Sequence, residues 1–227
     1  MLLEERSADE SARDYALRML KKNIVSMAIK PGEMVSEKEI AMQLGISRTP
    51  VREALQDLAK WQMVEILPQR GSRVALIDYA LVEESRFVRQ VLETAILDQV
   101  CERATPADIS QLRQNVRLQA LTQEPEMSGS LSMMELDDAF HQILFRIAQK
   151  ENTFRMLGGM TIHFDRVRTL ALNVVKDTKI INDHQLICDA IANRDVEGAR
   201  ELMIKHLSRV KLDEKSIRAA CPQFIKD

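Results

Sequence analysis

The sequence predicts a mainly α-helical protein in which an N-terminal winged helix-turn-helix precedes an all-α bundle of six to seven helices. Three observations lead to this fold class. Only 4% of the 227 residues are aromatic, and 7 glycines and 6 prolines leave long stretches without helix breakers. Helical periodicity continues from residue 81 almost to the end of the chain. One pair of strand-like segments, 64–67 and 72–75, flanks a turn at 68–71.

Length and composition fit one large domain or two modest ones. An apolar content of 45% over 227 residues is enough to build real cores. The order of the motifs favours a first domain at residues 1–76, a short linker at 77–80 and an all-helical domain at 81–227. The linker contains no glycine- or serine-rich tract, so it allows tight coupling between the domains.

The first domain is expected to begin with a helix at about residues 12–27. Its apolar residues follow one helical face, and Pro31-Gly32 ends the segment with a turn. Such a helix would pack behind the two helices that follow it. The apolar face consists of Ala16, Leu17, Leu20, Ile24 and Met27.

Two short helices are expected to meet at a turn between residues 36 and 60. Ser36 and Glu39 have the spacing of a capping box, and Gly45 supplies a left-handed residue that ends the first helix. Ser47 is expected to cap the second helix, and Pro50 falls in its first turn, where no amide donor is lost. The apolar face of the second helix consists of Val51, Leu55 and Leu58.

The exposed N-terminal end of the second helix carries Arg48, Thr49 and Arg52. Cations at this end oppose the helix dipole, so two arginines there indicate an external anion. An amphipathic helix pair with arginines on its solvent face also occurs in many proteins without this role. The hairpin that follows, with Arg70 and Gly71 at its tip, favours a winged helix-turn-helix that presents its second helix to DNA.

The candidate DNA contacts have distinct expected roles. Arg48 and Arg52 would read base edges or phosphates, while Ser47 and Thr49 would hold the DNA backbone. The formal net charge is −2, with +1 over residues 1–75 and −3 over the remainder, so DNA binding would depend on a local basic patch. The candidates that would flank the contact are Ser36, Lys38, Arg70 and Gly71.

The second domain is expected to contain only helices. A polar loop at residues 124–130 interrupts the pattern, and Thr105-Pro106 marks a helix start. The expected helices lie at 81–104, 106–122, 131–149, 153–176, 178–193 and 196–219.

All four histidines of the chain lie in the second domain. His141 follows Asp137 by four residues, so the two side chains share a helix face. His184 and His206 lie near the middle of the last two helices, which antiparallel packing can bring together. One carboxylate and three imidazoles suit a divalent cation inside a bundle. The competing interpretation is that these are surface or hydrogen-bonded histidines that bind nothing.

The remaining composition bears on the cellular compartment. Cys101, Cys188 and Cys221 are widely spaced and form no CxxC pair, which favours a reduced, cytoplasmic protein. No uninterrupted apolar run reaches the roughly 18 residues that a membrane span requires. We therefore expect neither export nor insertion into a membrane.

Four short segments of the first domain follow one another in a definite order. They are Lys30-Pro-Gly-Glu33, Ser36-Glu-Lys-Glu39, the run Gly45-Ile-Ser-Arg-Thr-Pro-Val-Arg-Glu-Ala54, and Pro68-Gln-Arg-Gly71. Together they resemble the DNA-binding domain of GntR-family bacterial transcription regulators, over roughly residues 10–75. Gln62 departs from the family pattern, which usually has glycine between the recognition helix and the first wing strand. The departure leaves the geometry of that turn open.

The second domain contains three segments that extend this resemblance. Asp137 to His141, Asn182-Asp-His184 and Met203-Ile-Lys-His206 resemble the metal-binding positions of the FCD effector domain. That all-helical domain follows the winged domain in the FadR-type branch of the family. The resemblance implies that Asp137, His141, His184 and His206 bind a divalent metal ion such as zinc, with nickel, manganese and iron as further candidates.

The same resemblance leaves room for a ligand beside the metal. Four protein ligands leave one or two positions on a five- or six-coordinate ion, where water or an effector carboxylate can bind. Asp138 also faces His141, although Asp137 has the family spacing, and Cys188 is interpreted as a small core residue.

The far end of an effector carboxylate needs a cation or a hydrogen-bond donor. Arg89 and Arg168 are the candidates, and Arg166 is a less favoured one. His163 matches no metal-ligand position, so we interpret it as packing or as lining of the effector pocket. The competing interpretation is that the arginines form local salt bridges, as the four-residue spacing of Arg89 and Glu93 allows.

The resemblance therefore implies a cytoplasmic, homodimeric transcription regulator, with repression relieved by ligand as the usual arrangement. Its partners would be roughly palindromic operator DNA and a small carboxylate such as a sugar acid, dicarboxylate or hydroxy acid. An alternative is a metal-dependent hydrolase or lyase that uses the His/Asp site, although no general base stands beside the histidines. A further alternative is a helical scaffold whose histidines bind nothing.

Overall fold

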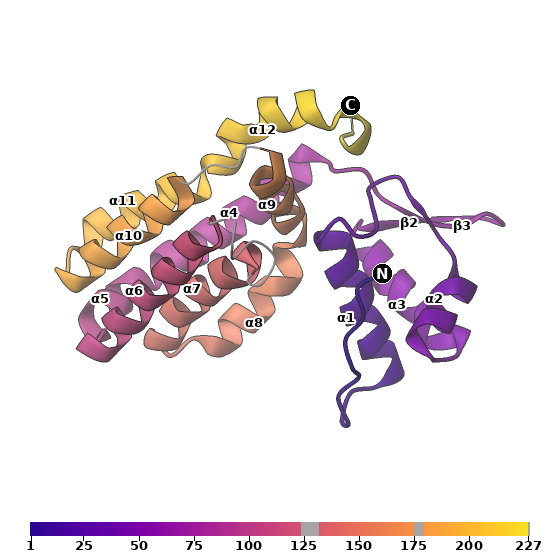
Figure 1. Ribbon diagram of the computed structural model, residues 1–227, viewed down its shortest axis with the longest axis horizontal. Helices are drawn as coiled ribbons and strands as arrows, with labels where there is room; N and C mark the ends of the chain where they lie inside the picture. The colour runs from indigo at the N-terminus through magenta and orange to yellow at the C-terminus, as the bar shows by residue number, and fades with distance from the viewer. Residues whose placement is uncertain (124–131, 175–178, 227) are drawn as a thin grey trace.

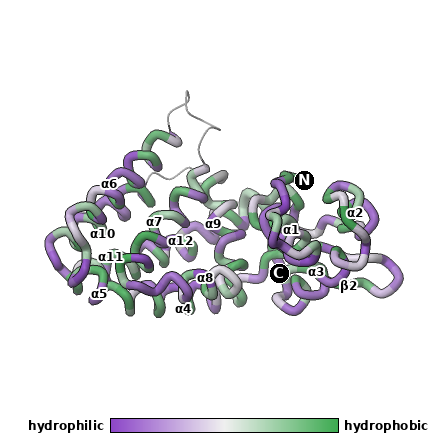
Figure 2. Tube along the Cα trace, turned by 90° about the horizontal axis from the view of Figure 1, so that it is seen from below, coloured by the Kyte–Doolittle hydropathy of each residue, from purple (hydrophilic) through white to green (hydrophobic). Residues whose placement is uncertain are grey.

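The computed structural model describes residues 1–123, 132–174 and 179–226, which form two lobes (Figure 1). The loop predicted at 124–130 lies outside the described residues. Viewed from below, the lobes lie end to end, with α5 and α6 at one end and α2 and β2 at the other (Figure 2). The mainly α fold class predicted from the sequence, with a winged N-terminal part and a helical C-terminal part, is confirmed.

The N-terminal lobe consists of three helices and a small antiparallel sheet. The helices are α1 (Ala12–Val25), α2 (Glu37–Leu44) and α3 (Arg48–Lys60). The strands β2 (Val64–Leu67) and β3 (Gly71–Val74) form the predicted hairpin. A third strand, β1 (Met34–Val35), was not predicted; it pairs with β3 and gives the strand order β1-β3-β2. Two residues are too short a run to carry an alternating pattern, so this strand has no periodic signal.

The apolar faces predicted for α1 and α3 form the core of this lobe. Val51, Leu55 and Leu58 of α3 are fully buried against α1, which contributes Leu20 and Ile24. Burial of these side chains stabilises the lobe, at about 1.5–3 kcal/mol for each large aliphatic side chain. The packing of these two apolar faces therefore fixes the orientation of α3 relative to α1.

Two helix ends in this lobe use left-handed residues. Gly45 has φ of 65° and ends α2 as predicted. Gln62 has φ of 56° after α3, and its amide donates to Ala59 O while the Met63 amide donates to Leu58 O. This is the Schellman arrangement, in which glycine is usual because it has no Cβ to clash. Gln62 thus adopts the turn that the family forms with glycine.

The C-terminal lobe is built only from helices in the part of the chain that the structure describes. Where six to seven helices were predicted, nine α-helices are observed there, followed by a short 3-10 turn. They are α4 (Tyr79–Ala95), α5 (Leu97–Arg103), α6 (Pro106–Leu121), α7 (Met133–Ile147), α8 (Glu151–Met160), α9 (Ile162–Val174), α10 (Lys179–Ala192), α11 (Val196–Leu207), α12 (Arg209–Ala220) and the turn η2 (Pro222–Phe224).

The larger number arises because three predicted helices are each interrupted at one residue. Thr94 Oγ1 donates to Gln90 O at 2.7 Å just before the break between α4 and α5. Ser208 Oγ donates to Ile204 O at 2.7 Å at the break between α11 and α12. Hydroxyl groups bonded to the carbonyl four residues earlier bend helices. The α8–α9 break follows Gly158 and Gly159, which weaken a helix interior.

The segment that joins the lobes is braced by the end of the chain. Ile77 forms a parallel bridge with Ile225, and Asp78 caps α4 through a 2.9 Å bond from the Ala80 amide. Lys226 Nζ also donates to Asp78 at 2.7 Å. Figure 1 places the C-terminus beside this segment. No described helix is both long and apolar enough to cross a membrane.

Candidate metal centre and DNA-binding surface

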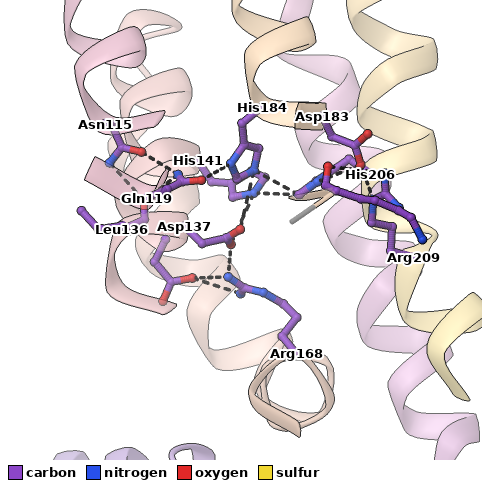
Figure 3. A network of polar contacts seen from close by, with 12 residues as sticks. Asn115, Gln119, Leu136, Asp137, His141, Arg168, Asp183, His184, His206 and Arg209 are labelled. Carbon is purple, nitrogen blue, oxygen red and sulfur yellow. Dashed lines mark hydrogen bonds and ion pairs between the residues drawn. The ribbon is translucent and has the colours of Figure 1, made fainter. Parts of the chain in front are cut away.

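Four side chains predicted as metal ligands meet inside the C-terminal lobe (Figure 3). Asp137 and His141 come from α7, His184 from α10 and His206 from α11. All four are buried, and one potential ligand atom from each lies within 4.8 Å of the others. The structure thus brings together the three segments that the sequence placed on separate helices.

The local sequence explains how each side chain reaches the centre. Asp137 and His141 are one helical turn apart on α7, so both side chains leave the helix on its buried face. The neighbouring α10 and α11 contact each other along their length and bring His184 beside His206. Phe140 stacks on the His184 ring with centroids 4.0 Å apart, which restricts that ring further.

The separations between the ligand atoms fit a metal ion. His206 Nε2 lies 3.3 Å from both His141 Nε2 and His184 Nε2. Asp137 Oδ1 lies 3.6 Å from His184 Nε2, and Asp137 Oδ2 lies 3.7 Å from His141 Nε2. A tetrahedral ion with ligand bonds of about 2.0–2.1 Å separates its ligand atoms by about 3.3 Å. The four residues therefore enclose a space with the dimensions of such an ion.

Residues outside the centre contact the far nitrogen of two rings. Gln119 Oε1 accepts from His184 Nδ1 at 2.8 Å, and Glu93 Oε2 lies 2.5 Å from His141 Nδ1. The Asp183 carboxylate is 3.9 Å from His206 Nδ1, beyond direct hydrogen-bond range. A proton held at Nδ1 leaves the lone pair on Nε2, which is the atom that faces the centre.

Burial keeps two of these rings neutral. Removal from water lowers the pKa of His184 to about 3 and that of His206 well below its ordinary value. Burial alone would raise the pKa of the Asp137 carboxyl, but the charge of Arg168 outweighs it and holds that pKa well below its usual range. The centre thus presents an ionised carboxylate together with two neutral imidazoles, those of His184 and His206, which are the states that bind metal.

Arg168 on α9 lies on the other side of Asp137. Its guanidinium donates to Asp137, to Asp138 at 3.0 Å and to Asp165 at 2.9 Å. Asp138, considered from the sequence as an alternative ligand, therefore faces Arg168. Burial raises the pKa of the Cys188 thiol to about 12, so this residue stays protonated and is a poor metal ligand.

Arg89 belongs to the same group of charges. It donates to Glu93 within α4 and lies 3.8 Å from Asp165 on α9. Because Glu93 contacts His141 and Arg168 contacts Asp137, the charged side chains form a closed ring beside the metal centre. Both arginines that were predicted to contact an effector lie in this ring.

A small cavity adjoins the centre. It measures about 30 Å³, which is room for about one water molecule, and Asp137, Arg168 and His206 contribute to its wall. A wider surface groove of about 710 Å³ runs between α6 and the end of α10 and contains none of the four candidate ligands. The space for a ligand of several atoms is therefore not open at the centre in this conformation.

His163 and Arg166 lie away from the metal centre. His163 Nε2 donates to Trp61 O at 2.8 Å, and Arg166 Nη2 donates to Ala75 O at 2.6 Å. Both acceptors belong to the N-terminal lobe. The structure thus places these two α9 residues at the junction between the lobes.

The predicted DNA-contacting residues lie on one exposed end of α3 and on the hairpin. Arg48, Thr49 and Arg52 are exposed, and Ser47 occupies the N-cap position without a capping bond from its side chain. Its hydroxyl is thus left available for a phosphate. Ser36 instead caps α2 by accepting from the Glu39 amide at 3.4 Å. The exposed flanking positions are Lys38, Arg70 and Gly71.

The two recognition-helix arginines already have an anion beside them. Arg52 donates to Glu37 through two nitrogens at 2.9 and 3.0 Å, and Arg48 donates to the same carboxylate at 3.4 Å. Glu37 is the first residue of α2. The positive charge at the start of α3 is therefore partly balanced within the protein. The sequence alone had indicated only an external anion for these arginines.

The residues around the far nitrogens of the histidines were not predicted from the sequence. Glu93 was considered only as a helical partner of Arg89, although that pair extends to His141. Gln119 and Asp183 carry no spacing signal, because their contacts join helices that are far apart in sequence.

Models of known protein families match both lobes of the chain. The family model described as "Bacterial regulatory proteins, gntR family" matches residues 14–74, and the FCD domain matches residues 84–209. An uncharacterized HTH-type transcriptional regulator of Streptomyces ambofaciens is 35% identical over 216 residues, 93% of this chain and 88% of that protein. The HTH-type transcriptional repressor RspR of Escherichia coli is 33% identical over 202 residues, 88% of each chain.

A solved structure of similar shape is E. coli McbR/YncC. It covers 90% of this chain and 99% of its own, with a TM-score of 0.74 and 21% identity, which supports the fold alone. The matched families consist of transcription regulators, so the alternative of a hydrolase or lyase is set aside. The chain belongs to the GntR family, in the branch that joins a gntR DNA-binding domain to an FCD domain, and is a DNA-binding transcription regulator.

Proposed function

We propose that this regulator is a cytoplasmic, homodimeric repressor whose affinity for operator DNA is controlled by a small carboxylate bound beside a divalent metal ion. The winged domain at residues 1–76 would bind DNA, and residues 81–227, beyond the linker at 77–80, would bind the metal and the effector. One observation carries the proposal: three Nε2 atoms and a carboxylate converge in a buried space of ionic size.

The tautomers of the histidines support a cation at that point. His184 Nδ1 is bonded to Gln119, so its Nε2 carries a lone pair directed at the centre. His206 Nε2 lies within 3.3 Å of two other Nε2 atoms. Lone pairs held together in a dry interior repel one another unless a proton or cation lies between them. Because burial opposes protonation of His184 and His206, a metal ion is the cation that suits this space.

The charges around the centre lead to the same proposal. Among the described residues, four carboxylates and three cations make up this group, so one negative charge remains. The carboxylates are Asp137, Glu93, Asp165 and the half-exposed Asp138, and the cations are Arg89, Arg168 and Lys21. A divalent cation would offset this excess, and an isolated buried charge is costly. We favour zinc for its match with the observed ligand separations, with nickel, manganese and iron as alternatives.

The effector we propose is a sugar acid or a similar small carboxylate. When bound, the metal ion would supply a Lewis-acidic position for one carboxylate oxygen. Arg168 already binds three carboxylates, two of them in the ring, so its guanidinium can exchange one of them for an effector carboxylate. Arg89 would neutralise the carboxylate that Arg168 releases, since it lies 3.8 Å from Asp165.

DNA binding would place the start of α3 in the major groove of a roughly palindromic operator. Arg48 and Arg52 would exchange Glu37 for phosphates or base edges, and Arg70 and Gly71 at the wing tip would contact the flanking groove or backbone. A repressor role is supported by the printed name of the E. coli relative RspR.

The DNA-binding part is tested by Arg52→Ala. We expect operator affinity to fall at least about tenfold and the slope of log affinity against log salt to decrease by about 1, because one phosphate or base contact is removed. Fluorescence anisotropy with an operator fragment selected from random DNA measures both quantities. Arg218→Ala, on the exposed side of α12, is the matched control. An Arg52→Ala protein with unchanged affinity would remove α3 as the recognition helix.

The effector-binding part is tested by a thermal-shift screen of sugar acids, dicarboxylates and hydroxy acids. A ligand present at 100 times its Kd stabilises the folded protein by about 2.7 kcal/mol, which is a readily measured shift. We expect stabilisation by one class of carboxylate in zinc-loaded protein and none after chelation. Stabilisation that persists unchanged in chelator would contradict the metal-linked pocket.

A further inference from the structure

We propose that α9 transmits occupancy of the metal centre to the DNA-binding lobe, with His163 and Arg166 as the positioning residues at the junction. This inference rests on the proposed function, since it assigns the route by which the metal centre and its ligand would act. One helix carries contacts to both places. Arg168 binds Asp137 at the centre, while Arg166 and His163, two and five residues earlier, bind the other lobe.

The N-terminal end of α9 is attached to both DNA-contacting elements. His163 donates to the carbonyl of Trp61, the residue that ends the recognition helix α3. Arg166 donates to the carbonyl of Ala75, which directly follows the wing strand β3. Ile162 is buried within the core of the N-terminal lobe itself. A displacement of α9 would therefore act on the recognition helix and the wing together.

Burial of Arg166 costs more stability than a purely structural contact would explain. It is fully buried, and burial lowers its pKa to about 10. Within the described chain, Nη2 has a hydrogen-bond partner while Nε and Nη1 have none. A buried charge with unsatisfied donors costs stability, and an apolar side chain of similar volume is often neutral or better. Its presence is better explained by fixing the position of α9 against the wing.

The same helix, from Phe164 to Leu172, lines the space that a ligand would need. Phe164, Arg168, Ala171 and Leu172 of α9 are four of the ten residues around the 30 Å³ cavity. Binding sites for small molecules usually measure about 300–1,000 Å³, so a carboxylate of several atoms does not fit without movement of the lining. Phe164 also lies under Arg89 and Arg168, with guanidinium-to-centroid distances of 5.3 and 5.9 Å. A change in the position of either guanidinium would therefore act on α9 through Phe164.

A metal ion alone would already change the forces on α9. Arg168 contacts the same Asp137 carboxylate that faces the histidines, so an ion bound there competes with the guanidinium for its negative charge. Because packed helices shift as units, a change at Arg168 is expected to move Arg166 and His163 with it. Zinc binding would thereby favour one arrangement of the lobes over another, provided its affinity differs between them.

Hydrogen–deuterium exchange of the full chain, measured with and without Zn²⁺, tests this route. In the wild type we expect zinc to change exchange both in α9 and at the end of α3, over residues 58–63. In the double variant His163→Leu Arg166→Met we expect the change in α9 to remain and the change at 58–63 to be lost. The double variant His163→Gln Arg166→Lys retains a donor for each of the two carbonyls and should restore most of the response. Arg103→Met, which removes another arginine that donates to a backbone carbonyl, is the matched control and should respond like the wild type.

Zinc uptake is measured in the same samples by isothermal titration, which separates the two levels of the proposal. Equal uptake in wild type and double variant, with the response at 58–63 lost only in the variant, supports α9 as the route. Equal uptake with that response retained in the double variant, or absent from the wild type, overturns it and leaves the proposed metal centre standing. Wild-type protein that takes up no zinc overturns both. If the double variant does not fold, loss of the response at 58–63 in His163→Leu alone and its return in His163→Gln, which keeps a donor for Trp61 O, decide the question.

Discussion

Asp137 is the residue on which the two halves of the C-terminal site depend. Its carboxylate faces His141 and His184 on one side and Arg168 on the other. The charge of Arg168 keeps its pKa low despite burial, so the acid stays ionised at any physiological pH. Spacing on one helix was enough to predict Asp137 and His141 as a pair, whereas Arg168 entered only as a distant candidate. Its contact with Asp137 depends on packing between α7 and α9, which no local pattern encodes.

The buried histidines predict loss of stability in acid. The pKa of His184 is lowered to about 3 and that of His206 is also lowered, whereas both would titrate near 6.5 in the unfolded chain. Between these values the unfolded state binds more protons, so lowering the pH favours unfolding. We expect metal-free protein to lose about 1.4 kcal/mol of unfolding free energy per pH unit for each such histidine below pH 6.5.

Urea denaturation at pH 7, 6 and 5, in the presence of chelator, measures this dependence. His184→Gln removes one of the titrating groups and should make the slope shallower by about 1.4 kcal/mol per pH unit. A wild-type protein equally stable at pH 7 and 5 would contradict the buried, neutral histidines.

Single backbone positions explain much of how the elements end. Hydroxyl bonds of Thr94 and Ser208 accompany breaks in helices that the hydrophobic pattern predicted to be continuous. Periodicity indicates which face of a helix is buried, but it does not indicate small bends. The strong signals were those with their own local chemistry, such as Gly45 at the end of α2 and the apolar face of α3. The β1 strand was missed because two residues carry no alternating pattern, and the residues supporting the histidines were missed because their partners are remote in sequence.

Gln62 at the end of α3 gives a prediction at the scale of the element. It holds a left-handed backbone conformation, which costs a residue with a Cβ more than it costs glycine. Gln62→Gly is expected to stabilise the protein by about 0.5–1 kcal/mol in urea denaturation. Gln56→Gly, in the exposed middle of the same helix, should instead destabilise by about 1 kcal/mol. If both variants shifted stability in the same direction, the account of this helix end would be wrong.

At the scale of the molecule, the two lobes are joined by more than the chain that runs between them. The segment after β3 is braced by the C-terminus through Ile77 and Ile225, and α9 reaches across to α3 and β3. The sequence predicted the two lobes and the short linker, and it suggested tight coupling from the absence of a flexible tract. It left His163 as a packing or pocket-lining residue and Arg166 as a less favoured effector contact, because a helical pattern does not reveal which neighbour a buried face meets.

The central claim is that Asp137, His141, His184 and His206 together bind one metal ion, and zinc titration of the chelator-stripped full chain tests it most directly. We predict one Zn²⁺ per chain in the wild type, more than about 100-fold weaker binding in His206→Phe, and wild-type binding in His163→Leu, since the fourth histidine lies outside the centre. Absence of stoichiometric zinc uptake in the wild type, or equal affinity in wild type and His206→Phe, would contradict the claim.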